Sequence, residues 1–232
     1  MKKGIAILSA IMLLCGSAMA QEQPYKETRD VTGFDEVAFC VAGEVYITIG
    51  EGYKVTLEGD KDYISEIETK VSDGELVIKT DKWFNTGNKK VIVDITMPSL
   101  KGLDVSGSGK VVLNNALKGD KLEVDISGSG KVCLIDVQLA NIECDISGSG
   151  VLMIEGEGTV GKLEVDISGS GNYKGPTTKL GTLDAAISGS GSCDCFVTDK
   201  IEAAISGSGN VYYSGNPKID ASISGSGHVR SK

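Results

Sequence analysis

The chain has 232 residues, of which 41% are hydrophobic, and its formal net charge is −9. A chain of this length and hydrophobicity can bury a core in one large domain or two small ones, and its acidity gives no reason to expect a nucleic-acid partner. Glycine is unusually frequent, with 31 glycines against 4 prolines, so the fold has to account for the glycines and for the apolar residues between them.

Residues 1–20 have the pattern of a secretory signal peptide. The segment starts with two lysines, continues with the apolar residues 5–14 and ends in the small-residue sequence AMA before Gln21. Cys15 raises lipid attachment as an alternative, but Leu14 stands where a lipobox needs a small residue. We expect an exported protein, located in the periplasm, on the outer-membrane surface or outside the cell. No later apolar run is long enough for a transmembrane helix.

Residues 21–100 predict strands without an obvious repeat. The segments EVYITI, YKVTLEG, ELVIKT and VIVDITM alternate apolar and polar residues and are separated by glycine-containing turns. The stretch DYISEIETK fits either a helical turn or a strand. In the loop KWFNTGN, Trp83 and Phe84 are candidates for stacking on a sugar ring, and equally for pinning a hairpin to the core.

Residues 101–232 contain a repeat with a period near 20. SGSG begins at Ser106, Ser127, Ser147, Ser168, Ser188, Ser206 and Ser224. Such a period is typical of a solenoid. The residues one and three places before the first serine are apolar, as is the residue five places before it from the second repeat on. Mostly polar residues stand between them, and the alternation resumes after the glycines. Each turn therefore has at least two strands, which stack in parallel on the next turn about 4.8 Å away.

The SGSG sequence is predicted to form a corner between two strands. Glycine allows a sharp bend and a close approach to the core, and serine hydrogen-bonds locally in tight turns. We divide the chain into a signal peptide (1–20), a β-rich N-terminal capping region (21–100) and an SGSG-repeat β-helix (101–232).

Outward positions of the first strand in each turn form two acidic columns. The first column is Asp104, Asp125, Asp145 and Asp166. The second is Glu123, Glu143, Glu164, Asp184, Glu202 and Asp220. Stacked carboxylates repel one another, so lysines, bound cations or raised pKa values have to relieve the repulsion. The aspartate column is a candidate weak calcium-binding face, with a solvated face paired to lysines as the simpler alternative. We expect no other cofactor and no metal site of defined geometry.

Three further features concern surfaces and thiols. Outward serines at the corners would form rows of hydroxyls able to bind ordered water or a repetitive glycan, unless they bond to their own backbone. Cys193 and Cys195 are expected to pack in the core, whereas Cys133 is expected to point outward. After Ser188 the turns shorten and carboxylates leave the first acidic column, so the C-terminal end of the solenoid, an open edge of strands, is a candidate for self-association.

A longer pattern resembles a known family. The strings GFDEVAFCVAGEVYITIGEGYKVTLEGD, VSDGELVIKT and VIVDITMPSLKGLDVSGSG resemble the bacterial family described as putative auto-transporter adhesin, head GIN domain, from about Val31 to His228. The resemblance implies an exported, right-handed, single-stranded parallel β-helix. It carries over no catalytic motif.

The expected function is therefore a non-enzymatic, adhesin-like binding scaffold of the cell envelope or surface. Its partner would be a glycan or a host or envelope protein. Two alternatives stay open: a carbohydrate-active β-helix enzyme that uses paired carboxylates, and a purely structural envelope component.

Overall fold

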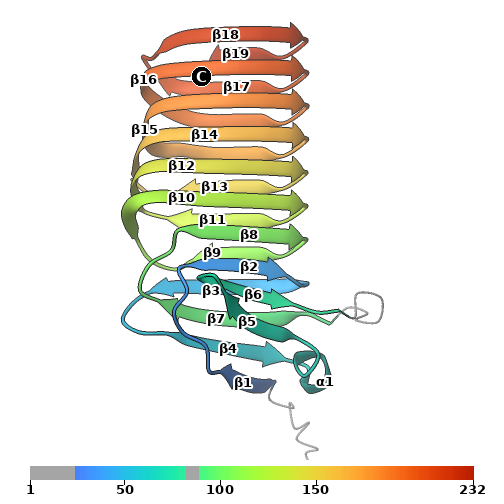
Figure 1. The fold of residues 1–232 in the computed structure, drawn as a ribbon. Coiled ribbons are helices and arrows are strands. Elements are labelled where there is room, and N and C mark those ends of the chain that lie inside the picture. Colours follow the sequence, from blue (N-terminus) through green and yellow to red (C-terminus); the bar gives the residue numbers. More distant parts are fainter. Residues whose placement is uncertain (1–23, 82–88) are drawn as a thin grey trace, which may run out of the picture.

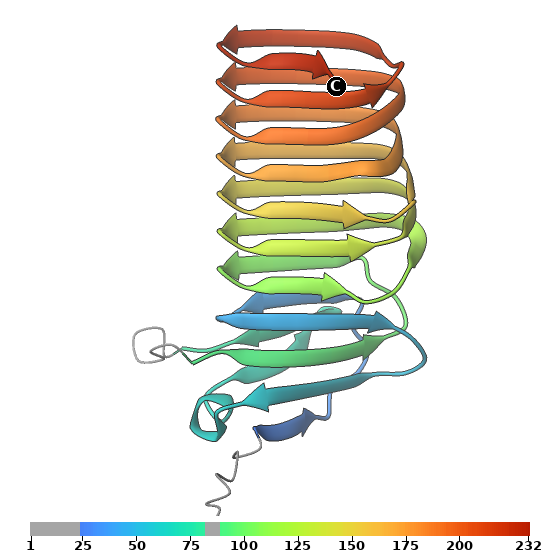
Figure 2. The ribbon, with the colours of Figure 1, turned by 180° about the vertical axis from the view of Figure 1, so that it is seen from behind.

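The computed structural model describes residues 24–81 and 89–232, and it is nearly all-β. The strands wind around one axis into a solenoid (Figure 1). Strands at the front of Figure 1 run left to right, those behind run the other way, as Figure 2 shows from the back, and the chain climbs with each turn. This sense of winding is right-handed, so the predicted fold class is confirmed. The segment 1–20 and the residues Trp83 and Phe84 lie outside the described residues.

The strands form two parallel ladders that face each other. The front ladder consists of β2 (Glu36–Cys40), β8 (Gly102–Gly107), β10 (Leu117–Gly128), β12 (Val137–Gly148), β14 (Thr159–Gly169), the second halves of β15 (Asn172–Gly189) and β16 (Ser192–Gly207), and β18 (Lys218–Gly225). The back ladder consists of β3 (Gly43–Ile49), β9 (Lys110–Leu113), β11 (Lys131–Ile135), β13 (Val151–Glu155), the first halves of β15 and β16, β17 (Asn210–Gly215) and β19 (His228–Ser231). Equivalent residues of successive repeats pair in register, for example Ile126 with Ile146 and Ile146 with Ile167.

The inward side chains of both ladders form one continuous apolar core. Isoleucine, leucine and valine columns are almost fully buried along it. Cys144, Cys193 and Cys195 are buried free thiols within the core, which confirms the expected packing of the last two. Of the side chains that the structure describes, Tyr173 is the largest that is fully buried, and Gly175 makes room for it, because a Cβ there would lie 2.2 Å from the tyrosine hydroxyl.

The solenoid begins before the first SGSG. Strands β2 and β3 form a complete turn under β8 and β9, with residues 40–43 (CVAG) in the place of SGSG. Strands β6 (Glu75–Lys79) and β7 (Val91–Met97) continue the two ladders below. The sequence shows no repeat here because these turns lack the serine-glycine marker.

Antiparallel strands close the N-terminal end. β4 (Lys54–Gly59) pairs with β7, β1 (Tyr25–Arg29) pairs with β4, and β5 (Glu68–Ser72) pairs with β6. The short helix α1 (Lys61–Ile64) precedes β5, so the stretch that fitted a helical turn or a strand contains both. Among the residues that the structure describes, no helix has the length and apolar character needed to cross a bilayer.

The SGSG corners depend on both of their glycines. The first glycine has a positive φ, +122° at Gly169, and a Cβ there would lie 2.6 Å from the carbonyl oxygen of Gly148 in the preceding turn. The second glycine packs on an isoleucine: a Cβ at Gly150 would lie 2.4 Å from Cγ2 of Ile126. L-residues rarely adopt such a φ, and neither contact leaves room for a side chain. The repeated isoleucine and the repeated glycine are therefore two halves of one packing interaction.

Candidate functional site

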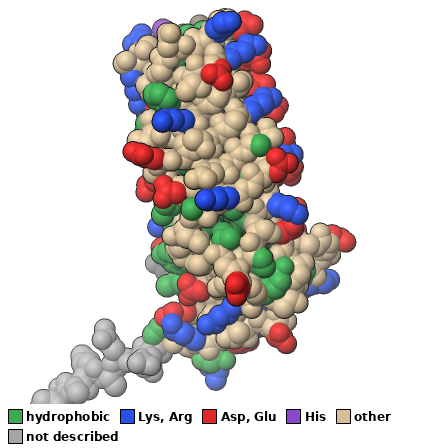
Figure 3. Space-filling view, turned by 90° about the vertical axis from the view of Figure 1, so that its left-hand side faces the viewer, with side chains coloured by type: hydrophobic (Ala, Val, Ile, Leu, Met, Phe, Trp, Pro, Cys, Tyr) green, Lys and Arg blue, Asp and Glu red, His purple; other side chains and the backbone are tan. Residues whose placement is uncertain are grey.

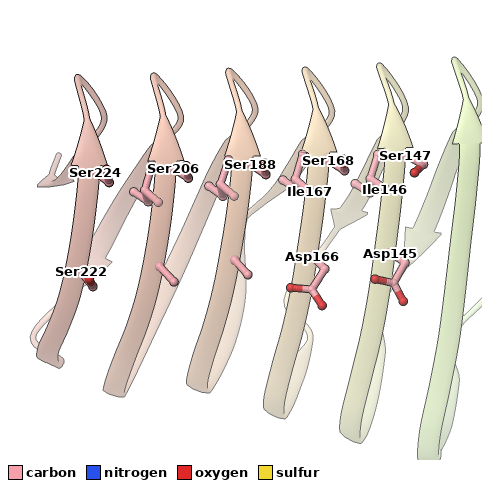
Figure 4. Close-up of a pocket in the computed structure, with 14 residues that line it drawn as sticks. Asp145, Ile146, Ser147, Asp166, Ile167, Ser168, Ser188, Ser206, Ser222 and Ser224 are labelled. Atoms are coloured by element: carbon pink, nitrogen blue, oxygen red, sulfur yellow. The ribbon is translucent and has the colours of Figure 1, made fainter.

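A groove of about 480 Å³ runs along the solenoid axis on the outer face of the front ladder (Figure 4). It crosses β12, β14, β15, β16 and β18 next to the SGSG corners. We call it the serine groove. Its outward-facing residues are Asp145, Ser147, Asp166, Ser168, Ala186, Ser188, Ala204, Ser206, Ser222 and Ser224. The first serines of the SGSG corners, from Ser147 to Ser224, form one line along the groove, and a second row beside it has two aspartates at one end and Ser222 at the other.

The groove exists because an outward column changes from aspartate to small residues. Strand pairing places Asp166 next to Ala186, Ala186 next to Ala204, and Ala204 next to Ser222. The two alanines leave space that the carboxylates fill in earlier turns. In the sequence, this change appears as a loss of negative charge from the column. The same loss of charge therefore indicates where the groove lies.

The serine hydroxyls of the corners are not used to build the fold. Ser106 donates to Asp104 over 3.1 Å, but from Ser127 onward no corner hydroxyl in the described chain makes a hydrogen bond to protein. The corners are held by backbone bonds instead: from Ser129 onward, the second serine of each repeat donates its N–H to a glycine carbonyl of the preceding turn, as Ser170 does to Gly148 over 2.7 Å. The outward hydroxyls are therefore available both to donate and to accept hydrogen bonds.

Lysines form ion pairs with the second acidic column from Glu123 to Glu202. Lys121 lies 2.5 Å from Glu123 and 2.8 Å from Glu143, and Lys162 lies 2.9 Å from Glu164 and 3.7 Å from Asp184. These carboxylates raise the pKa of both lysines through hydrogen bonds. Blue and red side chains accordingly lie close together along the right-hand edge of Figure 3, which is the front ladder.

The aspartate column has no such partners. Asp104, Asp125, Asp145 and Asp166 form no ion pair within the described residues. Partial burial raises the pKa of Asp125 and of Asp166, and neighbouring carboxylates, Asp145 first among them, raise it further. The four carboxylates succeed one another along the ladder, and in the part of the chain that the structure describes no three acidic, cysteine or histidine side chains converge as metal ligands do. The structure thus places the predicted residues in one outward-facing row that has no ion pairs within the described part of the chain.

A second hollow of about 380 Å³ lies at the corner between the first turn and the SGSG repeats. Cys40, Tyr63, Ser106 and Ser108 are among its lining residues. Burial raises the pKa of the Cys40 thiol, so the thiolate required of a nucleophile is disfavoured there. Among the thiols, the expected outward position of Cys133 is confirmed, since it is half-buried on the back ladder.

Comparison with known proteins agrees with this architecture. The family model described as putative auto-transporter adhesin, head GIN domain, matches residues 33–217. The chain belongs to this family. No curated protein matches the chain in sequence.

Solved structures similar to this GIN-domain chain share its fold over nearly their whole lengths. A putative adhesin from Bacteroides fragilis NCTC 9343 is 25% identical with a TM-score of 0.79, and the match covers 91% of this chain and 98% of that one. A putative adhesin from Parabacteroides distasonis ATCC 8503 is 22% identical with a TM-score of 0.72, covering 90% and 97%. A protein from the same strain, described as a putative lipid binding protein, is 21% identical with a TM-score of 0.66, covering 91% and 98%. The last two show a common fold. The family and these neighbours are described as adhesins or as a binding protein, not as enzymes.

Proposed function

We propose that the protein is exported to the cell envelope and serves there as a non-enzymatic binding scaffold, with the serine groove as its ligand site. The observation that carries the proposal is the line of outward serine hydroxyls that the fold itself leaves unbonded. Such hydroxyls can exchange hydrogen bonds with a ligand without breaking any that hold the corners.

The groove favours a linear ligand with regularly spaced polar groups. Its serines recur once per strand, about every 4.8 Å, and the same contact is offered by four or more successive turns. A polysaccharide chain has such a repeat, because each sugar ring presents similar hydroxyls. Many weak equivalent contacts then add to a useful affinity. The aspartates at one end favour an uncharged or cationic glycan over an anionic one.

The same proposal includes weak calcium binding by the aspartate column. The aspartate column is exposed and lacks lysine partners, so a divalent cation would relieve its repulsion and could also bridge to ligand hydroxyls. The carbohydrate-active enzyme alternative requires an acid and a base facing one bond, whereas the groove repeats the same side chains from turn to turn. The structural alternative predicts no ligand.

The test is a binding array of neutral, cationic and anionic glycans together with matrix proteins, with and without calcium. We expect saturable binding to a neutral or cationic glycan. The variant Ala204→Tyr fills the groove and should weaken binding by at least about tenfold, since the line of contacts is broken in the middle. Ala140→Tyr is the matched control, because Ala140 is exposed on β12 of the same ladder but outside the groove.

Each outcome bears on one of the three functions. Binding that Ala204→Tyr removes and Ala140→Tyr preserves supports the serine groove as the site. Binding that both variants preserve refutes the site. Release of shortened glycan products would favour the enzyme, and an array without any binding would favour the structural role.

A further inference from the structure

The C-terminal end of the solenoid exposes the residues that every earlier turn buries. In β18, Ile219 and Ile223 are 45% and 42% exposed, whereas their equivalents one turn earlier, Ile201 and Ile205, are 0% and 3% exposed. Ala221 between them is exposed as well. Among the strands that the structure describes, β18 has a neighbour only in β16, and β19 only in β17. This end therefore combines exposed apolar side chains with an open edge of backbone hydrogen-bonding groups.

We propose that this end binds the same end of a second copy of the chain. The opposite end differs, because antiparallel strands and α1 cover its apolar residues Tyr63, Ile64 and Ile67, which are at most 2% exposed, and the exposed apolar side chain on its outer strand β1 is a tyrosine, Tyr25. Head-to-tail stacking would leave the exposed isoleucines against a closed end. Two C-terminal ends are instead identical and can be related by a two-fold axis, which gives a closed dimer.

A two-fold axis also gives the edge strands a workable geometry. When the axis passes through the middle of β18, perpendicular to the front ladder, it reverses the strand direction, so β18 meets its copy in an antiparallel pair. With Ala221 on the axis, Ile219 of one copy lies opposite Ile223 of the other, and both face the core. The same register sets Lys218 opposite Ser224 and Asp220 opposite Ser222, so no like charges oppose each other.

The charge distribution along the solenoid permits this approach. The aspartate column stops at Asp166 and continues as Ala186, Ala204 and Ser222 toward the end. Three strand steps separate Asp166 from the edge, so the two columns of a dimer would stay about 34 Å apart, well beyond the screening length of about 8 Å in physiological salt. Repulsion between the aspartate columns of two copies is therefore weak.

The size of the end sets the expected strength. A strand of 8 residues is about 26 Å long, and two ladders about 10 Å apart with their outer side chains span about 20 Å, so the contact covers on the order of 500 Å² per copy. Stable complexes bury about 800 Å² per partner. We expect a reversible dimer with a dissociation constant in the micromolar range or above.

The test is sedimentation velocity on the purified protein from micromolar to millimolar concentration. The mass should rise from one copy toward two. Ile223→Lys should weaken the dimer by at least about tenfold, because it places a charge in the contact. Ile92→Lys is the matched control, since Ile92 is 40% exposed on β7, far from this end, and it should behave like the unmodified chain.

A cross-link tests the geometry independently. In an antiparallel pair centred on residue 221, the two Cα atoms lie about 4.5–5.5 Å apart, within the range of a disulfide. Ala221→Cys should therefore give a covalent dimer under oxidising conditions, whereas Lys26→Cys on β1 should not. A mass of one copy at all concentrations would overturn the proposal. So would a dimer that Ile92→Lys weakens as much as Ile223→Lys does, or a dimer that Ala221→Cys fails to cross-link.

Discussion

Replacing the first glycine of an SGSG corner by alanine has two possible costs, the unfavourable backbone conformation and the steric clash with the preceding turn. Two of these glycines allow the costs to be measured separately. Gly169 and Gly107 occupy the same corner position, and both have a positive φ, +122° and +88°. A Cβ at Gly169 would lie 2.6 Å from the carbonyl oxygen of Gly148, whereas a Cβ at Gly107 would meet nothing within 4 Å, because the turn below it carries CVAG instead of SGSG. Alanine at Gly107 therefore has only the conformational cost, and alanine at Gly169 has both.

The expected magnitudes follow from these contacts. The left-handed conformation costs alanine about 1–2 kcal/mol, partly offset by about 0.4–1 kcal/mol from the stiffer unfolded chain. Gly107→Ala should thus destabilise the protein by about 1 kcal/mol. At Gly169 the clash pushes away a carbonyl that accepts the N–H of Ser170 over 2.7 Å, which adds about 1–3 kcal/mol.

Urea denaturation followed by circular dichroism measures the difference. Gly169→Ala should lower the free energy of unfolding by at least about 1 kcal/mol more than Gly107→Ala does, with an unchanged m-value. Equal losses in the two variants would mean that the carbonyl moves aside freely. A larger loss for Gly107→Ala would refute the argument that the stacked turns select glycine by close approach.

The remaining predictions concern single side chains. The Tyr173 hydroxyl is fully buried and has no hydrogen-bond partner among the described residues, so Tyr173→Phe should raise the free energy of unfolding by about 1 kcal/mol in the same denaturation assay. A loss of stability would show that the hydroxyl is satisfied. The pKa of Asp166 is raised in the folded state above its unfolded value of 3.8, so the Asp166 charge reduces stability as the pH rises through this range. Asp166→Asn should therefore stabilise the protein at pH 7 by less than about 1 kcal/mol and lose this gain below pH 3.8. A gain that is constant with pH would contradict the electrostatic cause. At constant ionic strength, calcium should raise the melting temperature more than magnesium does, and an unchanged melting temperature in millimolar calcium would leave a solvated acidic face. Iodoacetamide should alkylate Cys133 of the folded protein before Cys144, as mass spectrometry of tryptic peptides would show, because only the former is accessible; the reverse order would place Cys133 inside.

The repeat makes much of the fold predictable. Alternation with a period of two identifies the strands, and the constant spacing of Ile126, Ile146 and Ile167 indicates the register in which they pair. The N-terminal turns are not recognisable in the sequence as part of the solenoid, because neither contains the SGSG sequence that marks the others. Their geometry depends on pairing with β8 and β9, which local sequence does not display.

The candidate site is less predictable than the fold. Alternation places the carboxylates on an outer face, but it does not show that lysines such as Lys121 neutralise one column and leave the other unpaired. That distinction depends on side-chain reach across neighbouring strands. The serine groove follows from the loss of side-chain volume at Ala186 and Ala204, which becomes a groove only when the turns are stacked.

The short range of the strand pairing also has a consequence for how the protein acquires its structure. Within the SGSG repeats, residues that pair are about 20 positions apart in a chain of 232, a ratio of about 0.1, which is more usual for the relative contact order of helical bundles than of β-proteins; the strands of the first turn, β2 and β3, pair with β8 and β9 over longer separations. Each turn needs only the previous turn as a template, and the closed N-terminal end provides the first one. A chain that crosses a membrane from its N-terminus can therefore fold turn by turn as it emerges, without waiting for its C-terminus.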